Sequence, residues 1–172
     1  VATSWGPVRL FRNRAGALEP WDPPFRGAGL PKEVERLSDW TGLWLGITAG
    51  DFDGDGRMDL AVGNWGRNHF LGASATHRPL RIRHGDLQGD GLWDVLESYV
   101  GADGRDWPVR KRPALAGLIP EAAARFPDSE SFGKASMEDL FGPLLKTLPT
   151  VSALNLDSGV LLNRGDHLEW RA

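Results

Sequence analysis

Short stretches in which hydrophobic and polar residues alternate predict β-strands through most of this chain. The segment 8–13 alternates and then turns at 14–16 into a second apolar run, a pattern typical of a β-hairpin. Residues 160–169 repeat this pattern. The equivalent positions are Asn13 and Asn163, and Leu18 and Leu168. We therefore expect the chain to begin and end on the same hairpin unit.

Two stretches depart from this alternation. Residues 19–39 contain so much Pro and Gly that we expect a long irregular connection between strands. Between residues 110 and 148 the hydrophobic period changes from two towards 3.6, which predicts a helical insert in the β scaffold. A capping-box pattern at Ser136 predicts a second helix there, while Pro120 and Pro143 should kink or end the helices. The insert either covers an apolar sheet surface or forms a surface on which a partner docks. The first apolar helix face comprises Leu115, Leu118, Ile119, Ala122 and Phe126.

The most informative polar pattern is an Asp-rich loop between two of the predicted strands. Its predicted calcium ligands are the side chains of Asp51, Asp53, Asp55 and Asp59 and the carbonyl oxygen of Arg57. Calcium takes about 6–8 hard oxygen ligands, and Gly54 and Gly56 let the backbone turn around the ion. Position 12 is Val62 rather than Glu and both flanks are strand-like, so we predict a β-hairpin connection instead of an EF-hand. A solvated Asp-Gly turn is the alternative, but it has no need of four acids in register.

The same pattern returns at Asp86, 35 positions after Asp51. Here the predicted ligands are the side chains of Asp86, Gln88, Asp90 and Asp94 and the carbonyl oxygen of Leu92. Because Gln88 is neutral, we expect the first loop to bind calcium more tightly. One Asp-rich turn per repeat at this period is typical of β-propeller blades. We therefore predict a mainly β fold, a partial β-propeller of about two to three blades with calcium-binding hairpin loops and a helical insert at 110–148, in a single domain over 1–172.

Composition restricts the partners and the compartment. The chain has 172 residues, of which 41% are hydrophobic and 25% charged, and its net charge of −3 offers no basic stripe for nucleic acid. Cysteine is absent, which excludes disulfides, thiolate catalysis and Cys-based zinc sites. Calcium modules that work at millimolar calcium are extracellular, so we expect a periplasmic, cell-surface or secreted location. No apolar run is long enough for a signal peptide or a membrane helix, so we expect a mature or excised piece with only indirect membrane contact.

These loops and hairpins resemble the FG-GAP/VCBS repeat family, whose loops follow the pattern Asp-x-Asp-x-Asp-Gly-x-x-Asp. The first loop fills the pattern, and the second departs from it only at Gln88. The segment 44–68, the helical insert and the closing Leu-Leu-Asn-Arg-Gly hairpin are similar to bacterial FG-GAP-like proteins that often carry an ASPIC/UnbV region. The resemblance implies calcium-binding propeller repeats in adhesive, structural or accessory proteins.

Little in the sequence indicates catalysis, and we expect this protein not to be an enzyme. No His-x-x-x-His or Gly-x-Ser-x-Gly motif occurs, and carboxylates that hold calcium stay ionised. The scattered polar candidates are His69, His77, His84, His167, Ser4, Ser38, Ser74 and Ser98. The leading hypothesis is a calcium-binding interaction or scaffold module of a larger extracytoplasmic assembly.

The alternative is a carbohydrate-binding or accessory domain of a secreted enzyme, in which exposed tryptophans such as Trp21, Trp65 or Trp107 form a sugar platform. We expect Trp40, Trp44 and Trp93 to lie in the core instead. A propeller closes with about 4–8 blades, so about two to three blades would leave sheet edges open to pairing. We therefore expect a fragment of a longer propeller, an oligomer, or a subunit whose edges a partner protein covers.

Overall fold

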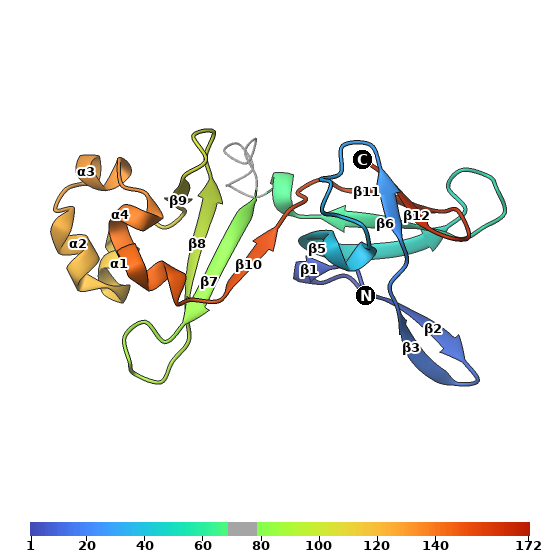
Figure 1. Cartoon of the computed structure of the whole chain (residues 1–172), viewed down its shortest axis with the longest axis horizontal. Helices are drawn as coiled ribbons and strands as arrows, with labels where there is room; N and C mark the ends of the chain where they lie inside the picture. Colours follow the sequence, from blue (N-terminus) through green and yellow to red (C-terminus); the bar gives the residue numbers. More distant parts are fainter. Residues whose placement is uncertain (69–78) are drawn as a thin grey trace. The chain divides into compact units, whose positions relative to one another are not determined.

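The computed structural model describes residues 1–68 and 79–172 (Figure 1). The chain forms two compact units, one comprising Val1–Ala73 and Ala153–Ala172 and the other Ser74–Ser152. We expected one domain over 1–172. Within this chain, the first unit contains both ends and the second contains the segment between them.

The first unit is based on a six-stranded sheet with the strand order β1-β5-β6-β11-β12-β4. Its strands pair antiparallel except for β12 and β4, which pair in parallel. A separate hairpin is formed by β2 and β3. The bounds are β1 Ser4–Pro7, β2 Leu10–Arg14, β3 Ala17–Trp21, β4 Phe25–Gly27, β5 Thr41–Gly50, β6 Asp59–Asn64, β11 Gly159–Asn163 and β12 Leu168–Arg171, with the 3-10 helices η1 Leu37–Asp39 and η2 Gly66–Asn68.

The two hairpins predicted at the ends of the chain are confirmed. Asn13 faces Leu18 across β2 and β3, and Asn163 faces Leu168 across β11 and β12. In each turn the Asn side-chain oxygen accepts the backbone N–H of a glycine with positive φ. The distance is 2.9 Å from Gly16 N to Asn13 Oδ1 and 3.0 Å from Gly165 N to Asn163 Oδ1. The same local chemistry therefore closes both hairpins.

The expectation that residues 19–39 lack regular structure is wrong in part. This stretch contains the end of β3, the short strand β4 and the 3-10 helix η1. Phe25 pairs with Leu168 of β12 and is buried, with 2% of its surface exposed. Burial and pairing with a distant strand outweigh the local preference of Pro and Gly for turns.

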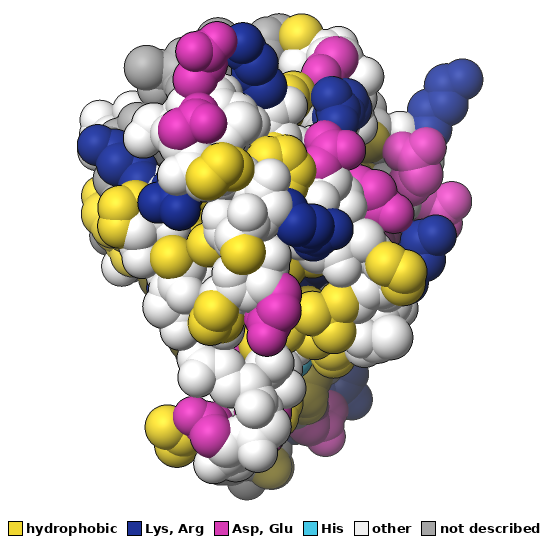
Figure 2. Space-filling model, turned by 90° about the vertical axis from the view of Figure 1, so that its left-hand side faces the viewer, with side chains coloured by type: hydrophobic (Ala, Val, Ile, Leu, Met, Phe, Trp, Pro, Cys, Tyr) yellow, Lys and Arg dark blue, Asp and Glu magenta, His cyan; other side chains and the backbone are white. Residues whose placement is uncertain are grey.

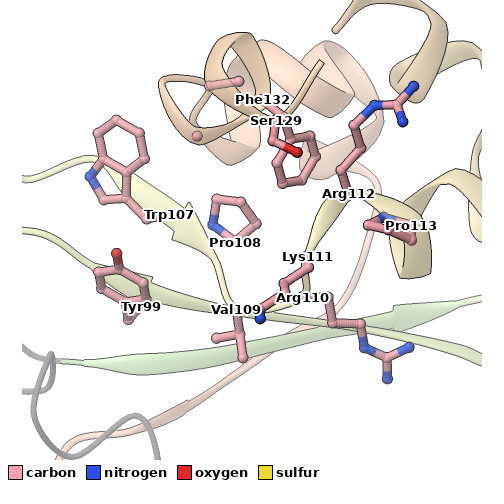
Figure 3. Close-up of a pocket in the computed structure, with 12 residues that line it drawn as sticks. Tyr99, Trp107, Pro108, Val109, Arg110, Lys111, Arg112, Pro113, Ser129 and Phe132 are labelled. Atoms are coloured by element: carbon pink, nitrogen blue, oxygen red, sulfur yellow. The ribbon is translucent and has the colours of Figure 1, made fainter. Parts of the chain in front are cut away.

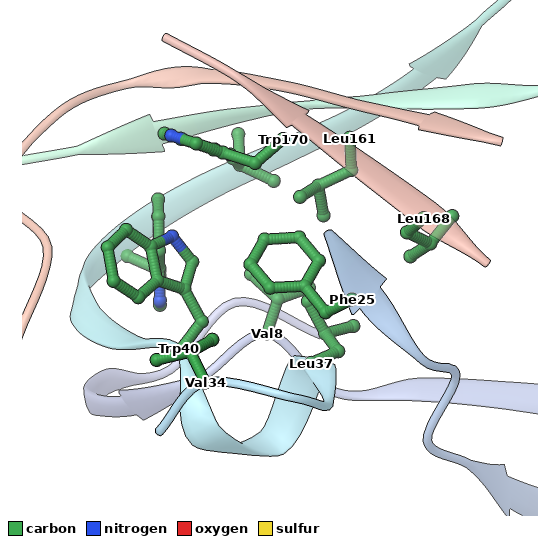
Figure 4. Packing of buried hydrophobic residues seen from close by; sticks show 10 residues of the cluster. Val8, Phe25, Val34, Leu37, Trp40, Leu161, Leu168 and Trp170 are labelled. Carbon is green, nitrogen blue, oxygen red and sulfur yellow. The ribbon is translucent and has the colours of Figure 1, made fainter. Parts of the chain in front are cut away.

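The core of the first unit is an aromatic cluster (Figure 4). Trp40 and Trp44 pack edge-on against Trp170, with ring centroids 6.2 and 6.0 Å apart, so their expected burial is confirmed. Edge-to-face contacts at this spacing stabilise a core beyond the area they bury. The cluster also contains Val8, Phe25, Val34, Leu37, Val62, Leu161 and Leu168.

The second unit combines a four-stranded sheet, ordered β10-β7-β8-β9, with short helices. β7 and β8 pair antiparallel around the second Asp-rich loop, as predicted. The strand bounds are β7 Leu80–Gly85, β8 Asp94–Val100, β9 Asp106–Pro108 and β10 Thr150–Ala153. The helices are α1 Arg112–Leu118, α2 Pro120–Arg125, α3 Ser129–Gly133, α4 Met137–Phe141 and the 3-10 helix η3 Gly142–Lys146.

The helix boundaries follow the sequence signals. The predicted capping box forms at the start of α4. The backbone N–H of Asp139 donates to the Ser136 hydroxyl, and the backbone N–H of Ser136 donates to the Asp139 carboxylate. Pro120 begins α2 after α1 has ended, and Pro143 lies in η3, just after α4. The predicted apolar face is confirmed, because its residues join one hydrophobic cluster that also contains Leu96 of β8. The helices therefore pack against β8 through Leu96.

Trp93 corrects another expectation. We expected it in the core, but 73% of its surface is exposed. It stands at the end of the second Asp-rich loop and stacks on His84, with centroids 5.0 Å apart and an interplanar angle of 18°. Taken as a whole, the fold is mainly β, as predicted, and its sheets, which contain hairpins with Asp-rich loops, agree with a partial β-propeller.

Candidate metal centre

The first Asp-rich loop joins β5 to β6 and is organised by Asp51. Its Oδ1 accepts the backbone N–H groups of Gly54 at 2.8 Å and Asp55 at 3.1 Å, and its Oδ2 accepts that of Gly56 at 2.9 Å. Gly54 and Gly56 have φ of +77° and +82°, which side chains with a Cβ rarely adopt. The two glycines therefore let the backbone wrap around one carboxylate.

Three of the four predicted carboxylates converge in this loop. Asp51, Asp53 and Asp59 each offer an oxygen, and these oxygens lie within 4.8 Å of one another. Asp59 is fully buried and Asp51 is exposed, while 25% of the Asp53 side chain is exposed. Asp55 lies outside this group, because its oxygens face Arg57. The backbone N–H of Arg57 donates to Asp55 Oδ1 at 2.9 Å, and its guanidinium pairs with Oδ2.

The second loop repeats the hydrogen bonds of the first. Asp86 Oδ1 accepts the backbone N–H groups of Gly89 at 2.7 Å and Asp90 at 3.0 Å, and Oδ2 accepts that of Gly91 at 2.9 Å. These donated N–H groups hold the pKa of Asp86 below its ordinary value. The two loops therefore share one local backbone structure, although no group of three acids converges in the second.

The carboxylates that close the two loops differ in their surroundings. Asp59 Oδ2 accepts the N–H of Phe52 at 2.9 Å, as Asp94 Oδ2 accepts that of Leu87 at 3.0 Å. Asp59 Oδ1 also accepts the backbone N–H of Asn163 at 2.7 Å, whereas Asp94 is only half-buried. The first loop is therefore braced by a strand from the other end of the chain.

Arg164 makes a second contact between the closing hairpin and the first loop. Its Nη1 lies 2.5 Å from Asp53 Oδ2 and 3.4 Å from Asp55 Oδ2, and its Nε donates to Glu169 at 2.8 Å. Figure 1 shows the β5–β6 loop beside the turn that joins β11 to β12. The guanidinium holds the pKa of Asp53 below its ordinary value, and Glu169 together with Asp53 raises the pKa of Arg164.

Sequence reasoning did not identify Asn163 or Arg164 as part of this site. The Leu-Leu-Asn-Arg-Gly motif was recognised only as a hairpin. Arg164 and Asp53 are 111 residues apart, so no local pattern connects them. Only the pairing of β11 with β6 brings the two turns together.

The oxygen atoms that converge in the first loop suit a hard cation. The converging side chains offer only carboxylate oxygens, which Ca²⁺ prefers over nitrogen or sulfur ligands. Asp59 is fixed by two backbone N–H groups and so presents a rigid carboxylate. The residues of the first loop therefore fit calcium in type and spacing.

A cavity in the second unit offers no comparable chemistry (Figure 3). It has a volume of about 420 Å³, and aromatic and aliphatic side chains such as Tyr99, Trp107 and Phe132 form much of its wall. Its basic residues include Arg110, which bonds Glu97 at 3.2 Å, and Arg112, which donates to the carbonyl of Phe126 at 2.7 Å. The described lining contains neither a carboxylate nor a histidine.

The remaining polar candidates have structural contacts where they are described. His84 stacks on Trp93, and His167 Nδ1 lies 2.7 Å from Asp166. Ser98 accepts a bond from Arg83, and Ser38 donates to Asp22 at 2.8 Å. Ser4 lies in β1. His69, Ser74 and His77 lie outside the described residues.

Charged side chains are mixed rather than sorted on the face shown in Figure 2, where Lys and Arg alternate with Asp, Glu and hydrophobic groups. Within the described parts of the chain, every helix is too short or too polar to span a membrane.

Comparison with known proteins gives one match. Residues 1–62 match the family model of the FG-GAP-like repeat, a range that includes β5, the first Asp-rich loop and the start of β6. Neither the curated proteins nor the solved structures contain a match. The matched range ends 24 residues before Asp86, so the second loop is related to the first through its own sequence and hydrogen bonds. The N-terminal part of this chain is therefore similar to an FG-GAP-like repeat.

Proposed function

We propose that this protein is a calcium-binding interaction module that works outside the cytosol. The observation that carries the proposal is the convergence of Asp51, Asp53 and Asp59 within 4.8 Å. Like charges this close repel one another, and a bound divalent cation would offset that repulsion. FG-GAP repeats generally bind calcium, which supports the same assignment.

The proposed ligands are assigned loop by loop. In the first, Asp51, Asp53 and Asp59 would hold the ion, with Asp55 and the carbonyl of Arg57 completing the oxygen set. In the second, the proposed ligands are Asp86, Gln88, Asp90, Asp94 and the carbonyl of Leu92. Bound calcium would neutralise the carboxylates and link the two strands that each loop joins.

The proposed partner is another protein in an extracytoplasmic assembly. FG-GAP repeats generally mediate protein interactions, and proteins that contain them are typically extracellular or secreted. The six-stranded sheet has β1 and β4 at its ends in the described residues, and such edges can pair with another chain. We propose a binding role without catalysis, in keeping with the structural contacts of His84 and His167.

A sugar platform has less support. The guanidinium of Arg12 lies over the ring of Trp21 at 4.0 Å, and that of Arg105 lies over Trp107 at 5.1 Å. Each of these rings thus has an arginine on one face. Trp65 is 45% exposed, but a platform requires a second, coplanar ring beside it.

Calorimetric titration of the metal-free protein with calcium tests the proposal. We expect two sites, and we expect Asp51→Asn to remove the site in the first loop. Asp103→Asn is the matched control, because Asp103 also accepts a backbone N–H in an exposed turn, from Arg105 at 3.0 Å. Absence of binding, or equal loss in both variants, would contradict the assignment.

Thermal unfolding gives an independent check. Calcium at about 100–1,000 times its dissociation constant should stabilise the protein by about 3–4 kcal/mol by mass action. The melting temperature should therefore fall in chelator. An unchanged melting curve would mean that both loops are ordinary turns.

A further inference from the structure

We propose that Arg164 is a built-in competitor of the cation in the first loop, so that the β11–β12 turn sets the calcium affinity of that loop. This inference rests on the proposed calcium site. It concerns a residue that lies outside both loops and outside the range matched by the repeat family.

The contacts of Arg164 place a positive charge on Asp53, a carboxylate that would otherwise be free to bind the cation. Arg164 Nη1 lies 2.5 Å from Asp53 Oδ2 and 3.4 Å from Asp55 Oδ2. Asp53 is one of the three converging carboxylates, so calcium must share this side chain with the guanidinium or displace it. Two cations this close repel each other, and this repulsion weakens binding of the ion.

The guanidinium is held in place from the other side. Its Nε donates to Glu169 Oε2 at 2.8 Å, across the same hairpin. Only 23% of the Arg164 side chain is exposed, and 25% and 22% of those of Asp53 and Asp55. Screening by water is therefore weaker here than for a fully exposed ion pair.

The second loop lacks this feature in the part of the chain that the structure describes. Asp86, Asp90 and Asp94 accept backbone N–H groups there and no arginine contacts them. In the first loop, by contrast, Arg57 and Arg164 offset two of four carboxylates. Counting only the charges of the loop residues therefore overestimates how much more tightly the first loop binds calcium than the second.

The test is a calcium titration of the full chain. Binding is monitored by NMR through the amide resonances of individual glycines. Gly54 and Gly56 report the first loop, and Gly89 and Gly91 report the second in the same sample. We expect Arg164→Gln to raise the calcium affinity of the first loop by about tenfold or more, since it removes a charge next to the ion. The affinity of the second loop should stay at the wild-type value.

Arg171→Gln is the matched control. Arg171 donates to the same Glu169 at 3.0 Å, but 63% of its side chain is exposed and it pairs with Glu169 rather than with the loop. We expect no change in either loop. Arg164→Lys should give an intermediate affinity, because it keeps the charge but loses the fork that reaches Glu169 and Asp53 together.

A second readout does not depend on fitting affinities. Without Arg164, the loop carboxylates lose their internal cation, so the melting temperature in chelator should fall. The rise in melting temperature on adding calcium should then be larger in Arg164→Gln than in wild type.

The outcomes separate this inference from the proposed function. If both glycine pairs respond to calcium but Arg164→Gln leaves the first loop unchanged or weaker, the competitor role is wrong and calcium binding stands. If neither pair responds in wild type or in the variant, the calcium assignment fails and the inference fails with it.

Discussion

Asn163 donates its backbone N–H to Asp59 Oδ1 at 2.7 Å, although the two residues are 104 positions apart. Asn163 also donates its side-chain amide to the carbonyl of Met58 at 3.2 Å. The last hairpin of the chain thus completes the hydrogen bonding of a loop that lies in the range matched by the FG-GAP-like repeat. The stability of this loop should therefore depend on both ends of the chain.

Replacing Asp59 should show that dependence. Asp59→Ala leaves the partly buried N–H groups of Phe52 and Asn163 without acceptors, which we expect to cost about 2–4 kcal/mol. Asp94→Ala in the second loop removes the acceptor of Leu87 alone and should cost about 1–2 kcal/mol. Urea unfolding in chelator measures both changes without a contribution from metal. Equal losses would mean that the bond from Asn163 adds nothing.

A buried ion cluster in the second unit supports another prediction. Asp106 Oδ2 pairs with Arg83 at 2.6 Å and with Arg81 at 3.0 Å, and Arg83 is buried. Asp106→Ala leaves the Arg83 charge buried without a carboxylate, so we expect a loss of about 3–5 kcal/mol.

Arg81→Ala is the control for this cluster, because Asp106 then keeps Arg83 as its partner. Arg81 is the more exposed of the two arginines, and its loss should cost about 1 kcal/mol or less. Denaturant unfolding of the two variants gives the comparison. A cost for Arg81→Ala as large as that for Asp106→Ala would show that the buried charge is not the cause.

Two strand glycines of the first unit should respond differently to a methyl group. A Cβ at Gly159 would lie 2.3 Å from the carbonyl oxygen of Arg171 and 2.6 Å from the Trp170 ring. A Cβ at Gly46 of β5 would meet nothing within 4 Å. We expect Gly159→Ala to destabilise the protein by about 1–3 kcal/mol or more and Gly46→Ala to be nearly neutral. Melting temperatures that fall equally would contradict the close packing of β11 on β12.

Acid should weaken the cap of α4. The backbone N–H and the hydroxyl of Ser136, and then Arg105, hold the pKa of Asp139 below its ordinary value of 3.8. A carboxylate whose pKa is lower in the folded state stabilises the protein above pH 3.8, and this contribution is lost as the pH falls through the folded-state pKa. Thermal unfolding between about pH 6 and pH 2.5 should therefore show a smaller acid-induced loss in Asp139→Asn than in wild type.

Glu138→Gln controls for the charge in that experiment. It removes a carboxylate from the same helical turn but leaves the capping box intact. Its loss of stability in acid should resemble that of wild type. If Asp139→Asn also follows the wild-type curve, the cap does not titrate in this range.

Local signals made several elements predictable. Hairpins appear as alternation around a turn, and the Asn-containing turns at 13–16 and 163–165 form the bonds that such residues favour. Ser136 caps α4, and Pro120 separates α1 from α2. Each of these features depends on residues within a few positions of one another, so the sequence displays them directly.

Other features depend on residues far apart and were missed or misjudged. Strand β4 exists because Phe25 pairs with Leu168, which composition alone cannot indicate. Trp93 lies at the end of the Asp-rich loop, directly before β8, and is exposed, although its side chain is as apolar as those of Trp40 and Trp44. Aromatic character predicts burial only when the backbone directs the side chain inward.

The same division holds for the candidate site. By itself, the sequence determined the spacing of Asp51, Asp53 and Asp59, the glycines that let the loop turn, and the recurrence of the pattern at Asp86. Only the tertiary structure decided that Asp59 is buried against Asn163 and that Arg164 lies on Asp53. The physical reason is that a loop's own backbone bonds arise within a few residues, whereas the charge around it depends on which distant strand pairs beside it. For the first loop that strand is β11, which pairs with β6 and is followed directly by Arg164.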